Sequence, residues 1–271
     1  MRNESNTRIR TRPRALRRWL ALTLAGAALI LLTSCGSAEP EQAPAPAVEP
    51  AALAKLPLAN TFGDLPAAPL DPAPADKTGG EVVHPKADIA VHDAPGGKPI
   101  ATLPAEQIGS PTWVPVIARQ GDWAHVLLPT RPNGASGWLH ATTDAVETAH
   151  NDFAVTVDRA AFRLEIFEAG RKTGSWTIGT GRPEHPTPAG RAFILASIEE
   201  SVNTYSPIVL PLSSHSDSHE TFGGGPGTVG IHTWPDNSFV GKATSDGCIR
   251  VTRDALERLV ELPLGTIVSI V

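Results

Sequence analysis

The stretch Ser245-Asp246-Gly247-Cys248-Ile249-Arg250 decides how the C-terminal half of this chain is interpreted. It holds one of the two cysteines in the sequence, and Gly230-Ile231-His232-Thr233 places a histidine sixteen positions before that cysteine. A thiol is mostly protonated at neutral pH, and a neighbouring imidazole can take its proton and stabilise the thiolate. The pattern therefore predicts that Cys248 is a nucleophile and that His232 is its proton acceptor and donor.

The other cysteine, Cys35, ends a segment with the pattern of an export signal. Seven arginines precede an uncharged run over 19–34, and sixteen residues at about 1.5 Å each fall short of a roughly 30 Å hydrocarbon core. The run ends in Leu32-Thr33-Ser34-Cys35, which resembles the bacterial lipobox, where the cysteine receives lipid and becomes the first residue. We expect a signal peptide over 1–34 and an extracytoplasmic protein anchored to the membrane through Cys35. A short uncleaved anchor helix is the alternative.

Charge argues against one class of partner. Removal of 1–34 lowers the number of Lys and Arg from 23 to 16 and of Asp and Glu from 28 to 27, so the net charge falls from −5 to about −11. Such an acidic protein has no electrostatic reason to bind nucleic acid. With Cys35 lipidated, Cys248 is left as an unpaired thiol outside the cytosol, which calls for a chemical role.

Three further segments follow the predicted signal peptide. Residues 35–80 are rich in Ala and Pro, which favours a semi-rigid tether or ordinary disorder. Residues 81–149 contain short β runs between turns such as Pro132-Asn133-Gly134, which suits a small barrel. This segment resembles bacterial SH3-like domains in Gly121-Asp122-Trp123 and Gly137-Trp138-Leu139. Such domains often bind cell-wall peptides, although a packing spacer is an equal alternative.

The last segment, 150–271, is also predicted to be β structure. Apolar residues alternate with polar residues over 153–157 and 162–166, and a last β run covers 266–271. One helix is predicted after Thr252, which can cap it, with an apolar face that ends before Pro263.

The residues around Cys248 and His232 resemble the L,D-transpeptidases, cysteine enzymes that cross-link peptidoglycan. Supporting features are Thr187-Pro188-Ala189-Gly190 and the stretch from His215 to Gly227, and 128–138 resembles the region before the catalytic domain in actinobacterial members. The resemblance implies a mostly β fold: a small SH3-like barrel followed by a β-sandwich-like catalytic domain with one or two short helices.

The resemblance also implies the chemistry. Cys248 would capture the third-residue carbonyl of a stem tetrapeptide as a thioester, and a neighbouring amine would then attack it. Since the family places its oxyanion hole in this turn, the amides of Gly247 and Cys248 are the expected donors. The partners would be peptidoglycan stem peptides, and the protein would face the cell wall. No cofactor is expected.

Two positions depart from the family pattern. Asp246 stands where histidine is frequent, and its charge would oppose thiolate formation if it pointed at the sulfur, so we expect it to point away. Thr233 stands where glycine is frequent, which bears on the orientation of His232.

Five residues are candidates for substrate binding, each with a structural alternative. Arg250 could bind a carboxylate or brace the turn through a buried ion pair, and Ser245 could donate a hydrogen bond or serve as a turn residue. His215 and His219 have the i, i+4 spacing of zinc ligands on a helix, but no apolar helical face surrounds them, so no metal site is expected. The five candidates are Tyr205, His215, Ser216, Ser245 and Arg250.

Three other functions share part of this pattern. Sortases share the order histidine, cysteine, arginine, but their histidine lies farther upstream and their Thr-Leu-x-Thr type sequence is absent here. A lipid-anchored wall-binding protein with a degenerate site is disfavoured by the presence of His232, Gly247 and Cys248 together. An L,D-carboxypeptidase, in which water replaces the amine, stays open.

Overall fold

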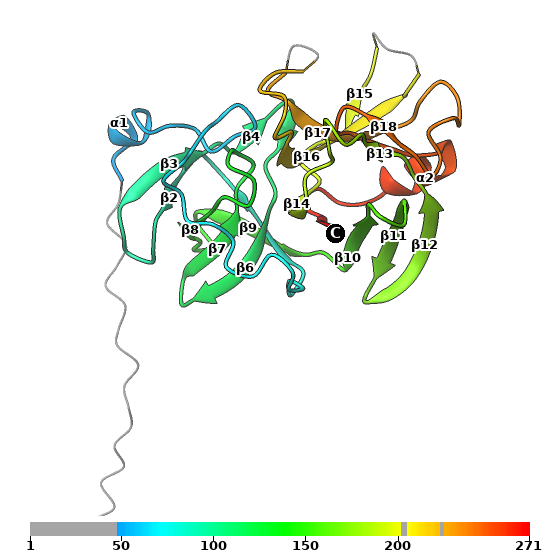
Figure 1. Ribbon diagram of the computed structural model, residues 1–271. Helices are drawn as coiled ribbons and strands as arrows, with labels where there is room; N and C mark the ends of the chain where they lie inside the picture. The colour runs from blue at the N-terminus through cyan, green and yellow to red at the C-terminus, as the bar shows by residue number, and fades with distance from the viewer. Residues whose placement is uncertain (1–47, 202–204, 223–224) are drawn as a thin grey trace, which may run out of the picture. The chain divides into compact units, whose positions relative to one another are not determined.

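The computed structural model describes residues 48–201, 205–222 and 225–271, which contain twenty strands and two short helices (Figure 1). The expected mostly β fold is confirmed. Within these ranges, neither helix is long and apolar enough to cross a bilayer. Residues 1–47 lie outside the described residues, so the signal peptide, the lipidation of Cys35 and the first part of the tether stay predictions.

The segment 81–149 forms a seven-stranded sheet in the order β3-β2-β8-β7-β6-β1-β9. All of its ladders are antiparallel. In the described residues no ladder joins β3 to β9, so the expected barrel is not seen as a closed one. The strands are β1 (Glu81–Pro85), β2 (Ile89–His92), β3 (Pro99–Leu103), β6 (Val114–Gln120), β7 (Trp123–Leu127), β8 (Ser136–His140) and β9 (Val146–His150), with a separate pair β4 (Glu106–Gln107) and β5 (Ser110–Pro111).

The expected tether is wrong over 48–80. These residues form a strap instead. After a single turn of helix, α1 (Pro50–Leu53), the strap makes β-bridges at Leu58, Asp64 and Leu70 to residues of the seven-stranded sheet and its loops. Apolar residues between its prolines, Ala59 and Leu65 among them, are buried in the core of that sheet. Burial of these side chains outweighs the extended preference of the prolines, which the composition alone could not reveal.

The segment 150–271 consists of two main sheets that share one apolar core, as the expected sandwich-like domain requires. One sheet has the order β12-β11-β10-β20-β14 and the other the order β15-β16-β17-β19. The strands are β10 (Phe153–Asp158), β11 (Arg163–Glu168), β12 (Arg171–Thr177), β14 (Gly190–Phe193), β15 (Ile198–Glu199), β16 (Ile208–His215), β17 (Thr228–His232), β19 (Ile249–Arg250) and β20 (Ile267–Ile270), with a further pair β13 (Thr180–Gly181) and β18 (Ala243–Ser245).

The predicted helix is α2 (Arg253–Leu259), and Ala255, Leu256 and Leu259 form its buried face. Thr252 is the N-cap residue in an extended conformation, but its side chain makes no capping hydrogen bond, so that detail of the expectation is wrong.

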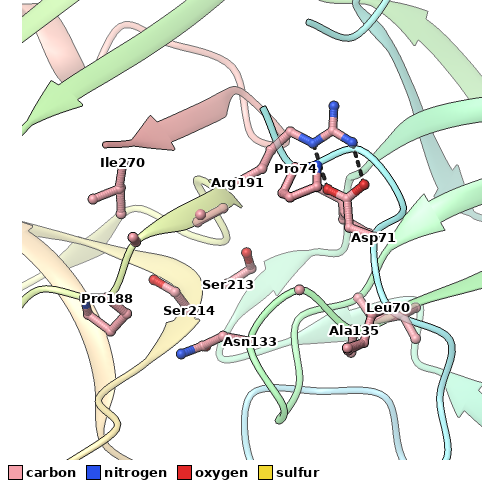
Figure 2. Close-up of a pocket in the computed structure, with 16 residues that line it drawn as sticks. Leu70, Asp71, Pro74, Asn133, Ala135, Pro188, Arg191, Ser213, Ser214 and Ile270 are labelled. Atoms are coloured by element: carbon pink, nitrogen blue, oxygen red, sulfur yellow. Dashed lines mark hydrogen bonds and ion pairs between the residues drawn. The ribbon is translucent and has the colours of Figure 1, made fainter. Parts of the chain in front are cut away.

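A buried ion pair ties the strap to the C-terminal segment. The Arg191 guanidinium, on β14, donates to both carboxylate oxygens of Asp71, at 2.8 and 2.6 Å, and its third nitrogen donates to the Asp76 carbonyl at 2.7 Å. The side chains are 3% and 2% exposed. Figure 2 shows this fork beside a pocket of about 260 Å³ between the strap and β14. A paired, fully hydrogen-bonded charge is tolerated in such a place, whereas an unpaired one is not.

We predict that Asp71→Ala lowers the free energy of unfolding by about 3–5 kcal/mol, because it leaves a buried guanidinium without its carboxylate. Glu165→Ala is the matched control: it removes the partner of Lys172 on the surface and should cost at most about 1 kcal/mol. Urea denaturation of both variants measures the difference. Equal losses would mean that the buried pair does not hold the strap.

Candidate active site

The predicted nucleophile lies in a turn between β18 and β19 that requires glycine. Gly247 has a φ of +114°, a conformation that side-chain-bearing residues rarely adopt. The Ser245 hydroxyl spans the turn: it donates to the Cys248 carbonyl at 2.5 Å and accepts from the Gly247 amide at 3.3 Å. Ser245 is 1% exposed and both of these bonds stay within the turn, which favours its alternative as a turn residue over substrate binding.

Thr187 braces the same turn from outside. Its buried hydroxyl donates to the Gly247 carbonyl at 2.8 Å and accepts from the Gly181 amide at 2.9 Å. Sequence reasoning noted Thr187 in a motif but assigned it no role, because nothing in the local pattern indicates which carbonyl a hydroxyl reaches 60 residues away.

The two amides expected to stabilise an oxyanion differ in their present partners. The Gly247 amide has the long bond to Ser245 just described. The Cys248 amide donates no hydrogen bond to any of the described residues. An oxyanion beside Cys248 would therefore find one amide free and one held by a bond near the long end of the normal range.

The strand order brings His232 to Cys248. His232 is the last residue of β17, which pairs in parallel with β19 so that Ile231 faces Ile249 and His232 faces Arg250. A backbone hydrogen bond with Gly230, also on β17, reaches the Cys248 thiol. Cys248, directly before β19, therefore lies close in the fold to His232 at the end of β17.

One hydrogen bond fixes the state of the imidazole. His232 Nδ1 lies 2.7 Å from the Thr233 carbonyl oxygen. Since a carbonyl only accepts, Nδ1 carries the proton and donates, and the neutral ring keeps its lone pair on Nε2. Thr233 is itself held, since its hydroxyl donates to the Tyr205 carbonyl at 2.6 Å and its amide donates to the Ser206 hydroxyl at 3.0 Å.

Burial keeps both partners uncharged at rest. Burial raises the pKa of the Cys248 thiol, and the Gly230 hydrogen bond and the Arg250 charge oppose that rise in part. Burial lowers the pKa of His232, against the effect of its bond to Thr233. A raised thiol pKa and a lowered imidazole pKa favour a neutral thiol beside a neutral imidazole.

The Asp246 carboxylate is paired with another residue. Its Oδ1 lies 2.6 Å from Arg182 Nη1, and both side chains are partly exposed. Its charge is the smallest of the four effects on the thiol pKa, which it raises. The expectation that the Asp246 side chain points away from the sulfur is consistent with this pairing.

Arg250 does not make the expected buried ion pair. Its guanidinium carbon lies 3.6 Å from the centre of the Trp234 ring, a cation–π contact. The Tyr205 ring lies 5.1 Å from Trp234 and 5.8 Å from His232, and the pKa of Tyr205 is raised by burial and by the nearby Cys248. Tyr205 and Trp234 line a pocket of about 490 Å³ that extends to Asp254. Sequence reasoning missed Trp234, although an aromatic residue two positions after the predicted base was the available signal.

His215 is not part of this site. It is fully buried, and its Nε2 lies 2.7 Å from the Thr61 carbonyl and 3.2 Å from the Thr61 hydroxyl. The Asn133 side chain accepts a hydrogen bond from the His215 amide and donates one to the His215 carbonyl. These contacts with Thr61 and Asn133 favour a structural role for His215 over the predicted substrate contact.

Ser216, the next residue, is 4% exposed, and its hydroxyl lies 3.8 Å from the point where a Cβ on Gly247 would stand. It therefore borders the nucleophile turn. The glycines at 223 and 224, in the expected lid, lie outside the described residues.

The comparisons with known proteins agree with this geometry. Residues 152–270 match the family model of the YkuD L,D-transpeptidase catalytic domain. Over these residues the chain is similar to L,D-transpeptidase catalytic domains.

Similar proteins cover the chain in part. The putative L,D-transpeptidase YkuD of Bacillus licheniformis is 31% identical over 119 residues, which are 44% of this chain and 65% of that protein, so the chain spans slightly less than two thirds of this relative. Among solved structures, an L,D-transpeptidase from Mycobacterium smegmatis is 14% identical with a TM-score of 0.40 and covers 70% of this chain and 96% of its own. The catalytic domain of the E. faecium L,D-transpeptidase is 20% identical with a TM-score of 0.35 and covers 45% and 98%.

We predict that alkylation of Cys248 by iodoacetamide keeps accelerating as the pH rises through the alkaline range, because the thiol pKa is raised and only the thiolate reacts. The measurement uses a Cys35→Ala background, in which Cys248 is the only thiol. Arg250→Met should move the profile to still higher pH, because it removes a charge that lowers the thiol pKa. Arg171→Met, on exposed β12, is the control and should not. A rate plateau between about pH 5 and 7 would instead indicate a resting thiolate–imidazolium pair.

Proposed function

We propose that this protein forms peptidoglycan cross-links by acyl transfer from a stem tetrapeptide through a Cys248 thioester to an amine. The observation that carries the proposal is the orientation of His232, whose Nδ1 is committed to the Thr233 carbonyl while Nε2 keeps its lone pair. A neutral imidazole held in one tautomer next to a thiol is what general base catalysis of thiol attack requires.

Acylation then proceeds from the neutral pair. As the sulfur attacks the donor carbonyl, its proton passes to His232 Nε2, so no stable thiolate has to form in this buried setting. The tetrahedral oxyanion is stabilised by the free Cys248 amide, and by the Gly247 amide once that amide leaves Ser245. The imidazolium gives its proton to the departing amine of the terminal D-amino acid, and the thioester remains.

Deacylation uses the same groups in reverse. The acceptor amine attacks the thioester carbonyl, His232 takes its proton, and the C–S bond breaks as the sulfur recovers a proton from the imidazolium. If water replaced the amine, the same steps would give a carboxypeptidase. Exclusion of water from the acyl site therefore decides between the two outcomes.

The surface formed by Tyr205, Trp234 and Arg250 is our candidate for substrate contact. Its two aromatic rings lie beside His232 and border a pocket of about 490 Å³, and the Arg250 guanidinium stacks on the Trp234 ring. Aromatic faces offer apolar area to a peptide, and a guanidinium can pair with a carboxylate, although here it must share its charge with the Trp234 ring.

The anchor completes the proposal. Leu32-Thr33-Ser34-Cys35 ends an uncharged run that follows seven arginines, which supports a lipidated Cys35 and thus an extracytoplasmic protein held at the membrane and facing the cell wall. The seven-stranded sheet would then stand between membrane and catalytic domain, and its resemblance to SH3-like domains supports contact with wall peptides. Metabolic labelling with palmitate, compared between wild type and Cys35→Ala, tests this part.

We predict that the purified protein, incubated with tetrapeptide-bearing muropeptides, yields cross-linked dimers by mass spectrometry. Cys248→Ala should abolish them, because no thioester can form. His215→Gln, which alters a buried histidine outside the site, is the matched control and should lower stability more than turnover. Shortened monomers without dimers would contradict transfer and indicate the carboxypeptidase, and product formation by Cys248→Ala would contradict the nucleophile.

A further inference from the structure

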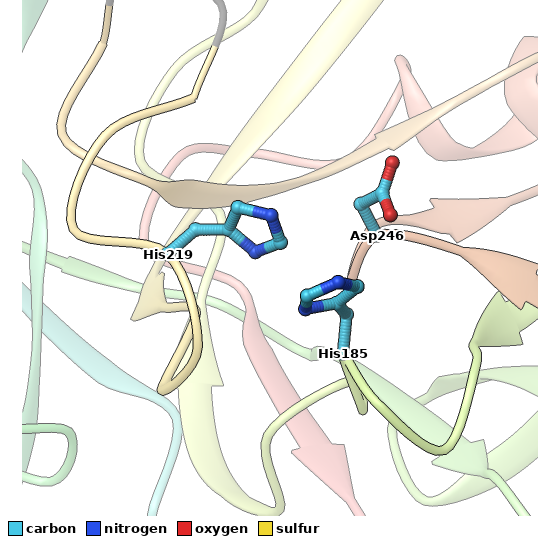
Figure 3. A group of neighbouring side chains, drawn as sticks. All are labelled: His185, His219 and Asp246. Carbon is cyan, nitrogen blue, oxygen red and sulfur yellow. The ribbon is translucent and has the colours of Figure 1, made fainter.

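Three polar side chains from distant parts of the sequence meet beside the nucleophile turn. They are His185, His219 and Asp246, and one ligand atom of each lies within 4.8 Å of those of the other two. Figure 3 shows these neighbouring side chains, which three separate loops carry. In the described residues this is the one group of three or more such side chains with that spacing.

The donor set fits a transition metal. Two imidazoles and one carboxylate are a common three-ligand set for Zn²⁺ and related divalent ions, with ligand distances near 2.0–2.2 Å. Atoms bound to one ion at those distances are about 3.3 Å apart in a tetrahedron. The present separations therefore require only small side-chain rotations, which three partly exposed residues can make.

Hydroxyl groups already orient both rings for metal binding. His185 Nδ1 lies 2.8 Å from the Ser218 hydroxyl, and His219 Nδ1 lies 3.3 Å from the same oxygen. A hydroxyl oxygen can accept two hydrogen bonds and donate one, and the Ser216 hydroxyl lies 3.2 Å away to receive it. With both Nδ1 atoms as donors, both rings keep the lone pair on Nε2, and metal-bound histidines commonly show this second-nitrogen bond.

The present partner of the carboxylate is replaceable. Arg182 Nη1 pairs with Asp246 Oδ1, but the arginine side chain is 42% exposed. It also has a second carboxylate within reach, since its Nε lies 3.7 Å from Glu184 Oε2. A divalent ion would therefore displace a solvent-screened surface cation, whose pairing contributes little.

From these contacts we infer that His185, His219 and Asp246 form a binding site for a divalent first-row transition metal, with Zn²⁺ as the probe. Three protein ligands leave at least one coordination position open. The carbonyl oxygen of His185 lies 3.9 Å from the point where a Cβ on Gly247 would stand. A bound ion would thus join the loops that carry the two histidines to the loop that presents Cys248.

Metal binding is measured directly, so the result does not depend on whether the proposed enzymatic function is correct. The full chain, freed of any purification tag and stripped with a chelator, is titrated with Zn²⁺ by calorimetry and with Co²⁺ by visible absorption. We expect one ion per chain. His185→Gln and His219→Gln should each weaken binding about tenfold or more, and His150→Gln, an exposed histidine beside Asp152, should leave it unchanged.

A gain of affinity gives the sharper test. Arg182→Ala removes the competing cation and should strengthen Zn²⁺ binding, whereas Arg171→Ala should not. Zn²⁺ should also raise the melting temperature of the wild type but not that of His219→Gln, because an ion that binds only the folded chain stabilises it. Absence of binding at about 0.1 mM Zn²⁺, or binding that survives both histidine substitutions and is lost in Cys248→Ser, would overturn the site.

Discussion

A single hydrogen bond, from His232 Nδ1 to the Thr233 carbonyl, determines what the rest of the site can do. It holds the imidazole in one tautomer and leaves Nε2 as the proton acceptor. The bond depends in turn on Thr233, whose amide and hydroxyl are both held by residues 205 and 206. Thr233 stands where glycine is frequent in the resembled family. Its hydroxyl adds a hydrogen bond between the residue next to His232 and the loop that carries Tyr205.

The nucleophile is positioned by hydroxyl groups. Ser245 and Thr187 each bond a carbonyl of the Gly247–Cys248 turn, from inside and outside respectively. Such bonds fix the backbone, and with it the Cys248 amide, before any substrate arrives. Because burial disfavours both charged forms, the same enclosure that orders the turn also keeps the thiol protonated at rest. In the proposed mechanism, proton transfer to His232 therefore accompanies the attack of the sulfur and does not precede it.

Sequence reasoning found the elements that local pattern determines. The helix after Thr252, the alternating strands of 153–166 and the Cys248–His232 pair each depend on spacing that the chain displays directly. It failed where contacts with a segment distant in sequence determine the conformation or the partner of a residue. Residues 48–80 resembled a tether because their composition is rich in proline, yet they pack on the sheet and place Thr61 against His215. His219 was paired with His215 by spacing, whereas the fold turns it toward His185 and Asp246. Thr187 carries no local signal of the Gly247 carbonyl that it contacts 60 residues away.

The central claim is that His232 rests as a neutral ring protonated on Nδ1. Nitrogen-15 NMR of protein labelled at histidine, with His232 assigned by comparison with His232→Gln, measures this directly. We predict that at pH 7 the Nε2 resonance has the shift of an unprotonated nitrogen and the Nδ1 resonance that of a protonated one. Because burial lowers the pKa of this residue, the ring should take a second proton only below the range of an exposed histidine. An Nε2-protonated tautomer, or a doubly protonated ring at pH 7, would contradict the account.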